Sequence, residues 1–144
     1  MLKVLFLCTG NSCRSQMAEG WARALKDDVV EAYSAGVETH GMNPRAIAVM
    51  AEAGIDITSQ RSKHVDELAD VDFDYVVTVC DNAAQSCPQF SGKAKVVRRL
   101  FDDPPRLAKD AASEEEALAP YRRVRDEIRD FVGKLPASLA DPTM

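Results

Sequence analysis

The chain has 144 residues, of which 46% are hydrophobic, and this length and composition suit one compact domain with a single core. With 18 basic and 23 acidic residues, its net charge of −5 argues against a broad basic surface for nucleic acid or an anionic membrane. The sequence has no secretory signal pattern and no apolar run that could span a bilayer, so we expect a cytoplasmic protein. We also expect it to be a monomer. In a reducing compartment, its four cysteines are expected to be functional or buried thiols rather than disulfides.

Hydrophobic patterns divide the chain into alternating strands and helices. Continuous apolar or β-branched runs predict buried strands, whereas apolar residues three and four positions apart predict helices. In chain order, the patterns predict a strand at 2–7, a helix from 12 or 13 to about 27, a strand at 29–35, a helix from 44 to about 54, a short helix or turn at 64–69, a strand at 73–80, a loop at 81–93, a strand at 95–100, a rigid loop at 101–105 and a helix from 113 to about 134.

Local signals set several of these boundaries. Gly36 is expected to stop the second strand, Pro44 suits the first turn of the second helix, and Gly54 suits its end. Ser113, followed three residues later by Glu116, predicts a capping box at the start of the last helix.

The alternation predicts an α/β fold: a single three-layer domain over residues 1–135, with a four-stranded parallel sheet covered by helices on both faces. Residues 136–144 are expected to form a frayed tail. In such sheets, ligands bind beyond the carboxyl ends of the strands. Cys8, Cys80 and the proline-stiffened loop with Asp103 each follow a predicted strand, so we expect them to meet at this edge.

The stretch CTGNSCRS, residues 8–15, joins the first strand to the first helix. Successive backbone N–H groups in such a loop form a concave nest, and the helix N-terminus adds positive potential, so the loop predicts a site for a tetrahedral oxyanion. Arg14 supplies a planar fork of donors for two oxygens. The same field favours the nucleophilic thiolate of Cys8. Ser15 is expected to donate a hydrogen bond to that sulfur, and Asn11 to hold the loop in a left-handed conformation.

The alternative interpretation makes Cys8 a small buried residue and Arg14 an ordinary solvated one. The Gly10-Asn11 turn between a clear strand and a clear helix favours the oxyanion site. Cys13, inside the loop, is expected to fill space rather than to react. The residues predicted to surround the anion are Thr9, Gly10, Asn11, Ser12, Cys13 and Arg14.

The longer stretch CTGNSCRSQMAEG resembles the signature loop of the low-molecular-weight protein tyrosine phosphatase fold, and it is closest to the thioredoxin-coupled arsenate reductase branch of that family. The segments VTVC at 77–80 and FDDP at 101–104 are also similar to that branch, so the resemblance covers nearly the whole chain. It implies an enzyme that reduces arsenate to arsenite, with phosphate or sulfate as competing oxyanions, no bound cofactor, and electrons from thioredoxin.

The resemblance further implies a relay of three thiols. Cys8 attacks arsenate, Cys80 then attacks the sulfur of Cys8, and arsenite leaves as a disulfide forms. Cys87 exchanges into that disulfide, which thioredoxin reduces. A flexible loop between Cys80 and Cys87 suits the in-line approach of sulfurs that exchange requires. In the alternative interpretation, Cys80 and Cys87 have no catalytic role. This interpretation would be favoured only if the sequence lacked the oxyanion loop.

Asp103 resembles the general acid of this fold, which protonates the leaving oxygen. For Asp102, and for Asp103 considered alone, a solvated loop position is the alternative. Residues 105–108, which directly follow Pro104, include no aromatic ring that could stack on an aryl ester, and this argues against tyrosine phosphatase activity.

Some reductases of this family hold a potassium ion beside the loop, with residues that correspond to Asn11, Glu19 and Ser34 and with a later aspartate. Lys63 stands where we expect that aspartate. Its ammonium can take the place of the cation, so activity is expected to be insensitive to potassium.

Two other functions stay open: a low-molecular-weight phosphatase that hydrolyses phosphate monoesters through a Cys8 phosphoenzyme, and a non-catalytic oxyanion-binding regulatory module. Neither a nucleic acid nor a membrane is expected as a partner. His40 and His64 are the only histidines and lie far apart in the sequence, so we expect solvated roles and no metal site.

Overall fold

The computed structural model describes residues 1–80 and 94–139, so the loop predicted at 81–93 lies outside the described residues. Within these ranges, four parallel strands form one sheet in the order β2-β1-β3-β4. The elements are β1 (Leu2–Cys8), α1 (Arg14–Leu25), β2 (Val30–Gly36), α2 (Pro44–Glu52), η1 (Val65–Leu68), β3 (Tyr75–Thr78), β4 (Lys95–Arg98), α4 (Pro104–Leu107), α5 (Glu114–Gly133) and η2 (Ala137–Leu139).

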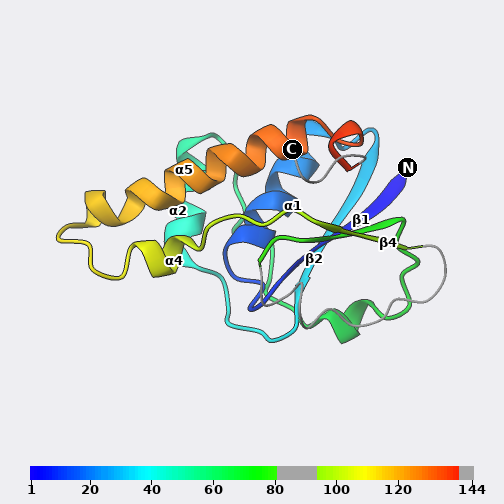
Figure 1. Ribbon diagram of the computed structural model, residues 1–144, viewed down its shortest axis with the longest axis horizontal. Coiled ribbons are helices and arrows are strands. Elements are labelled where there is room, and N and C mark those ends of the chain that lie inside the picture. The colour runs from blue at the N-terminus through cyan, green and yellow to red at the C-terminus, as the bar shows by residue number, and fades with distance from the viewer. Residues whose placement is uncertain (81–93, 140–144) are drawn as a thin grey trace.

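Strand β1 lies inside the sheet, and both of its faces are covered. Its residues from Val4 to Cys8 are all buried. Because successive side chains of a strand point to opposite faces, this run of buried residues requires cover on both sides. Figure 1 shows α1 and α5 on one side of the strands and the short helix η1 on the other. The predicted α/β fold with a four-stranded parallel sheet is confirmed.

Helices α1 and α5 pack against each other. The buried Trp21 of α1 donates its indole N–H to the backbone oxygen of Arg125 in α5, at 3.2 Å. The buried side of α5 consists of Ala117, Tyr121, Val124, Ile128, Phe131 and Val132. Because this contact fixes α1 against the rest of the domain, it also fixes where the loop before α1 ends.

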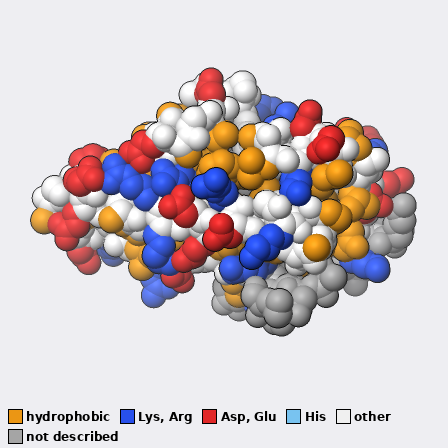
Figure 2. All heavy atoms as spheres, turned by 90° about the horizontal axis from the view of Figure 1, so that it is seen from above, with side chains coloured by type: hydrophobic (Ala, Val, Ile, Leu, Met, Phe, Trp, Pro, Cys, Tyr) orange, Lys and Arg blue, Asp and Glu red, His pale blue; other side chains and the backbone are white. Residues whose placement is uncertain are grey.

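The surface above α5 carries mixed charge. Arg122 pairs with Glu52 and Glu115, and Arg123 pairs with Asp102 and Glu127. Figure 2 shows basic and acidic side chains interspersed on this face rather than gathered by sign. In the part of the chain that the structure describes, no helix has both the length and the hydrophobicity needed to cross a bilayer.

Helix starts follow the predicted signals, with one change. Pro44 takes the first position of α2. Asn43, the residue before it, caps the helix, because its side-chain oxygen accepts two backbone N–H groups of the first turn. At α5, the hydroxyl of Ser113 accepts the N–H of Glu116, as predicted. The Glu116 carboxylate, however, accepts the N–H of Ala112 rather than that of Ser113, so the capping box is displaced by one residue.

Four predicted segments differ from the structure. The strands expected at 73–80 and 95–100 are shorter, Tyr75–Thr78 and Lys95–Arg98. The loop expected to be rigid at 101–105 instead begins the helix α4, because proline fits the first turn of a helix, where no backbone donor is needed. The tail expected from residue 136 includes η2, whose Leu139 is buried in the core.

Gly36 ends β2 where the 8–15 loop passes close by. A Cβ atom at Gly36 would lie 2.7 Å from the backbone oxygen of Thr9 and 2.8 Å from the backbone nitrogen of Asn11, and it would also overlap the backbone of Glu38. All three neighbours are main-chain atoms and cannot rotate away. Gly36 is therefore required for the close approach of β2 to the loop.

Replacing Gly36 with alanine should lower the free energy of unfolding by about 1–3 kcal/mol, because overpacked atoms must shift the backbone. The same variant should bind sulfate more weakly. Urea denaturation and sulfate titration measure these two effects. Gly133→Ala is the matched control, since a Cβ there meets nothing within 4 Å. If Gly36→Ala were as stable as Gly133→Ala, the proposed packing role of Gly36 would be wrong.

Candidate active site

Backbone carbonyl groups of the 8–15 loop accept hydrogen bonds from residues that pack around the loop. The backbone oxygens of Thr9, Gly10 and Ser12 accept N–H groups of the segment after β2, at 2.9 to 3.0 Å, and that of Asn11 accepts the Gln16 side chain. Across a planar trans peptide, a carbonyl and the next N–H point in opposite directions. The amides of residues 10–13 therefore point to the other side, and they donate to no residue that the structure describes. These amides form a nest for an oxyanion.

Asn11 holds this arrangement together. Its φ of 49° lies in the left-handed region, as predicted, and its side chain is fully buried. Its amide donates to the hydroxyl of Ser15 at 2.9 Å. Its oxygen accepts from the Gln16 amide and from the backbone N–H of Lys63, both at 2.9 Å. Gln60 in turn donates to the side-chain oxygen of Gln16 at 2.8 Å.

The structure brings Arg14 and Asp103 together above the nest. Arg14 donates from one terminal nitrogen to the backbone oxygen of Phe101 at 2.9 Å, and the other lies 3.6 Å from the Asp103 carboxylate. The buried Nε–H of Arg14 has no hydrogen-bond partner among the described residues, so it is free to donate to an anion. Asp102 instead pairs with Arg123 on α5, at 2.9 Å. Of the two aspartates, Asp103 is therefore the one that lies beside Arg14.

Cys80 follows β3 and reaches the start of the loop. Its sulfur accepts the backbone N–H of Thr9 at 3.1 Å and lies 3.1 Å from the Thr9 hydroxyl. Cys80 lies close enough to Cys8 to affect the pKa of its thiol, and both residues are buried. The predicted meeting of Cys8, Cys80 and Asp103 at the edge of the sheet is thus present. Cys87 lies outside the described residues.

The pKa of the Cys8 thiol is raised well above its usual value. The largest cause is its hydrogen bond with Cys80, and burial adds to it. The positive charge of Arg14 and the N–H of Thr9 act in the opposite direction without offsetting these effects. The lowering effect predicted for Arg14 is present, but the neighbouring thiol, which the prediction left out, acts in the opposite direction together with burial.

Ser15 and Cys13, two further residues of the loop, have structural contacts in the folded protein. The hydroxyl of Ser15 accepts from Asn11, and no hydrogen bond joins it to the Cys8 sulfur in this structure, so the predicted contact with the nucleophile is absent. Ser15 supports Asn11 instead. Cys13 is buried, and burial raises its pKa to about 12. A protonated, buried thiol agrees with the space-filling role expected for Cys13.

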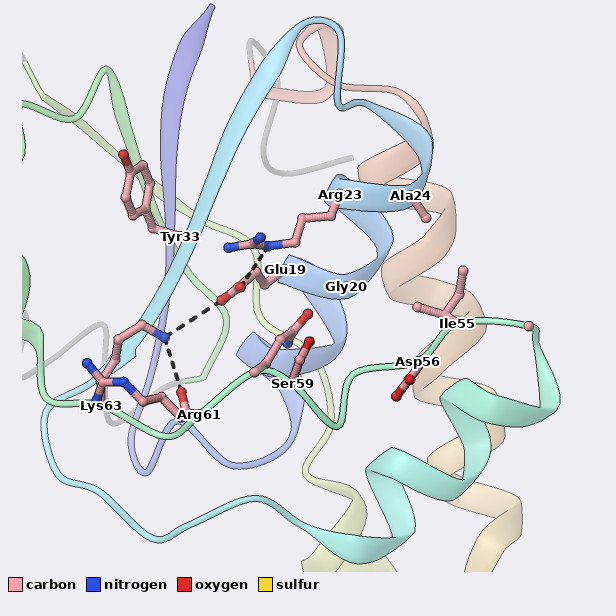
Figure 3. A pocket seen from close by; sticks show the side chains of 12 residues that line it. Glu19, Gly20, Arg23, Ala24, Tyr33, Ile55, Asp56, Ser59, Arg61 and Lys63 are labelled. Atoms are coloured by element: carbon pink, nitrogen blue, oxygen red, sulfur yellow. Dashed lines mark hydrogen bonds and ion pairs between the residues drawn. The ribbon is translucent and has the colours of Figure 1, made fainter.

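Lys63 lies beside Glu19, as Figure 3 shows. Its ammonium is 3.8 Å from one carboxylate oxygen of Glu19 and donates to the backbone oxygen of Arg61 at 3.1 Å. Ser34 donates to that same oxygen of Glu19 at 2.5 Å, while Arg23 binds the other oxygen at 2.9 Å. The cation of Lys63 thus lies next to two residues of the potassium site that the family resemblance implied. Potassium-insensitive activity stays a prediction.

His40 has a structural role that the sequence did not indicate. A Cβ atom at Gly10 would overlap the His40 ring, so the ring packs directly against the loop. The ring also bonds to the Glu38 carboxylate at 2.7 Å. His64 caps the start of η1 by accepting the N–H of Asp66. Both side chains are partly exposed, but His40 contacts the loop rather than only solvent.

Residues 3–143 match the family described as low molecular weight phosphotyrosine protein phosphatase. The chain belongs to this family. An arsenate reductase of Halalkalibacterium halodurans is 50% identical over 125 residues, which is 87% of this chain and 88% of that protein. An arsenate reductase of Staphylococcus aureus is 46% identical over 88% of this chain and 89% of its own length.

Solved structures of the family share this fold. An arsenate reductase in its oxidized state is 33% identical, with a TM-score of 0.78 over 96% of this chain and 99% of its own. A low molecular weight protein tyrosine phosphatase from T. tengcongensis is 28% identical, with a TM-score of 0.73 over 96% of this chain and 100% of its own. Reductases and phosphatases of the family therefore resemble this fold to a similar degree, and the fold alone does not separate them.

Replacing Cys80 with alanine removes the largest cause of the raised Cys8 pKa, so that pKa should fall. A thiol is alkylated as its thiolate, and the rate rises as the pH rises through the pKa. The pH profile for iodoacetamide alkylation of Cys8, followed by peptide mass spectrometry, should therefore move to lower pH in Cys80→Ala. Cys13→Ala is the control and should leave the profile in place. An unchanged profile in Cys80→Ala would contradict the coupling of the two thiols.

Proposed function

We propose that this protein is an arsenate reductase that takes its two electrons from its own thiols. The observation that carries the proposal is the second buried thiol, Cys80, which contacts Thr9 beside Cys8 and affects the pKa of the Cys8 thiol. A phosphatase needs a nest, a nucleophile and an acid, but no second sulfur. The arsenate reductases that are 50% identical to this chain support the same choice.

The first step forms a bond between sulfur and arsenic. Arsenate binds with its oxygens on the amides of residues 10–13 and on the guanidinium of Arg14. Because the pKa of Cys8 is raised, its proton must leave on binding, and a basic oxygen of the arsenate dianion can accept it. The sulfur attacks arsenic, and Asp103 protonates the oxygen that departs as water.

The second step reduces arsenic. The Cys80 sulfur attacks the Cys8 sulfur, the sulfur–arsenic bond breaks, and its electron pair stays with arsenic, which leaves as arsenite. Two thiols become one disulfide, which balances the change from As(V) to As(III). Thr9 donates to the Cys80 sulfur at 3.1 Å and so stabilises the negative charge that the attacking sulfur needs.

Regeneration completes the relay. We assign the next step to Cys87, which attacks Cys80 and frees Cys8 as the disulfide moves to Cys80 and Cys87. Thioredoxin, a dithiol protein, then reduces that disulfide by the same exchange chemistry. No bound cofactor is needed, because every electron passes through sulfur. The chemistry requires a reducing compartment, which suits the cytoplasm.

Hydrolysis of phosphate monoesters is the second candidate, because the pair of Arg14 and Asp103 also suits phosphoryl transfer. The described residues that follow Asp103, in α4, include no aromatic side chain. An aryl ester would therefore find no ring to stack on there, and we expect at most residual phosphatase activity. A regulatory module without turnover is the remaining alternative.

One coupled assay separates the three functions. With thioredoxin, its reductase and NADPH present, arsenate should trigger NADPH oxidation in proportion to enzyme, because each arsenite formed leaves one disulfide. The control is the same mixture with sulfate in place of arsenate. Rapid aryl phosphate hydrolysis without arsenate-dependent oxidation would identify a phosphatase. Retained anion binding with neither activity would identify a regulatory module.

A further inference from the structure

A hollow of about 540 Å³ opens beside α1, apart from the nest of the 8–15 loop. Figure 3 shows side chains of α1 and of the segment after α2 lining it. The lining residues that matter below are Glu19, Arg23, Ile55, Ser59, Gln60 and Lys63.

The hollow offers more hydrogen-bond donors than its buried acid can use. Glu19 is only 2% exposed, and both of its oxygens are already committed: one to Ser34 and Lys63, the other to the Nε–H of Arg23. The terminal nitrogens of Arg23 have no acceptor in the part of the chain that the structure describes. The ammonium of Lys63 donates only to the backbone oxygen of Arg61 there, so part of its donor capacity is free.

The other charged groups that line the hollow, Arg61 and Asp56, have partners outside it. Arg61 binds Glu67, which lies outside the lining, at 2.6 Å. One oxygen of Asp56 accepts both the backbone N–H and the hydroxyl of Thr58. Arg23 and Lys63 share the single carboxylate of Glu19, so two positive charges at the hollow face one negative charge, and an anion can balance the excess.

The hollow is connected to the oxyanion nest by two short hydrogen-bond routes. The backbone N–H of Lys63 donates directly to the Asn11 side chain at 2.9 Å. Gln60 donates to Gln16 at 2.8 Å, and Gln16 donates to Asn11 at 2.9 Å. Both routes end on the residue that sets the shape of the loop.

We propose that this hollow is a second anion-binding site, which takes a small organic phosphate with its phosphate group between Arg23 and Lys63. The volume exceeds that of a bare oxyanion, and Ile55 supplies an apolar wall for carbon atoms. The bound anion joins α1 to the segment that carries Gln60 and Lys63. It therefore stabilises the hydrogen bonds on Asn11, whichever reaction the nest performs.

Amide chemical shifts of the ¹⁵N-labelled full chain test this proposal, with glycerol 3-phosphate as the probe. Amides of Gly20 and Ser59 report on the hollow, and amides of residues 10–15 report on the nest. We expect the two groups to saturate along different binding curves. The hollow is no separate site if both groups follow one curve, or if the amides of the hollow do not saturate.

Ser59→Glu and Ser59→Gln form a matched pair, because Ser59 is exposed and makes no side-chain hydrogen bond with the described residues. The added carboxylate should weaken binding at the hollow by about tenfold or more, since it repels the phosphate, while the neutral glutamine should not. The nest curve should be the same in both variants. Equal affinity of the two variants at the hollow would overturn the proposal.

The connection to the nest has its own measurement. With the probe bound, the backbone amide of Lys63 should exchange with solvent about fivefold more slowly, because its bond to Asn11 opens less often. This slowing should be smaller in Ser59→Glu, in which only the nest is filled. Equal slowing in the wild type and in Ser59→Glu would show that the hollow has no influence on Asn11.

Discussion

The hydrogen bonds of Asn11 set the shape on which the rest of the site depends. A left-handed residue in the middle of a loop is unfavourable, and here a fully buried side chain with partners in α1 and in the segment after α2 offsets it. With Asn11 fixed, the carbonyl groups of the loop turn outward, and its amides turn toward the anion. Gly36 and His40 pack against the same loop, so its conformation is determined from several sides at once.

The contact between Cys8 and Cys80 gives the nest its particular chemistry. The neighbouring Cys80 thiol and burial both disfavour the thiolate of Cys8, and this raises the pKa of Cys8. The proposed reduction needs a second thiol beside Cys8, whereas hydrolysis has no use for one.

The sequence predicted the elements of the fold well, because continuous apolar runs and helical spacing are local signals. It also placed Cys8, Cys80 and Asp103 at one edge, since the ends of parallel strands must meet there. It did not predict the partners of Asn11, because Gln16 and Gln60 are polar residues whose burial depends on tertiary packing.

Two errors have the same physical origin. The low pKa expected for Cys8 followed from helix and arginine effects alone, whereas a neighbouring thiol reversed the direction. The hydrogen bond expected from Ser15 to the Cys8 sulfur was inferred from the position of Ser15 in the loop, whereas the Ser15 hydroxyl is bonded to the Asn11 side chain. Both outcomes depend on which side chains contact each other in the folded protein, and spacing along the chain does not predict those contacts.

The relay itself is tested most directly by Cys87→Ser in a single-turnover experiment with excess arsenate. The account predicts one arsenite per enzyme molecule, no further turnover with thioredoxin, and a disulfide between Cys8 and Cys80 in the peptide map. Cys80→Ser is the matched control and should release no arsenite. Continued turnover of Cys87→Ser, or arsenite release without a Cys8–Cys80 disulfide, would contradict the central claim.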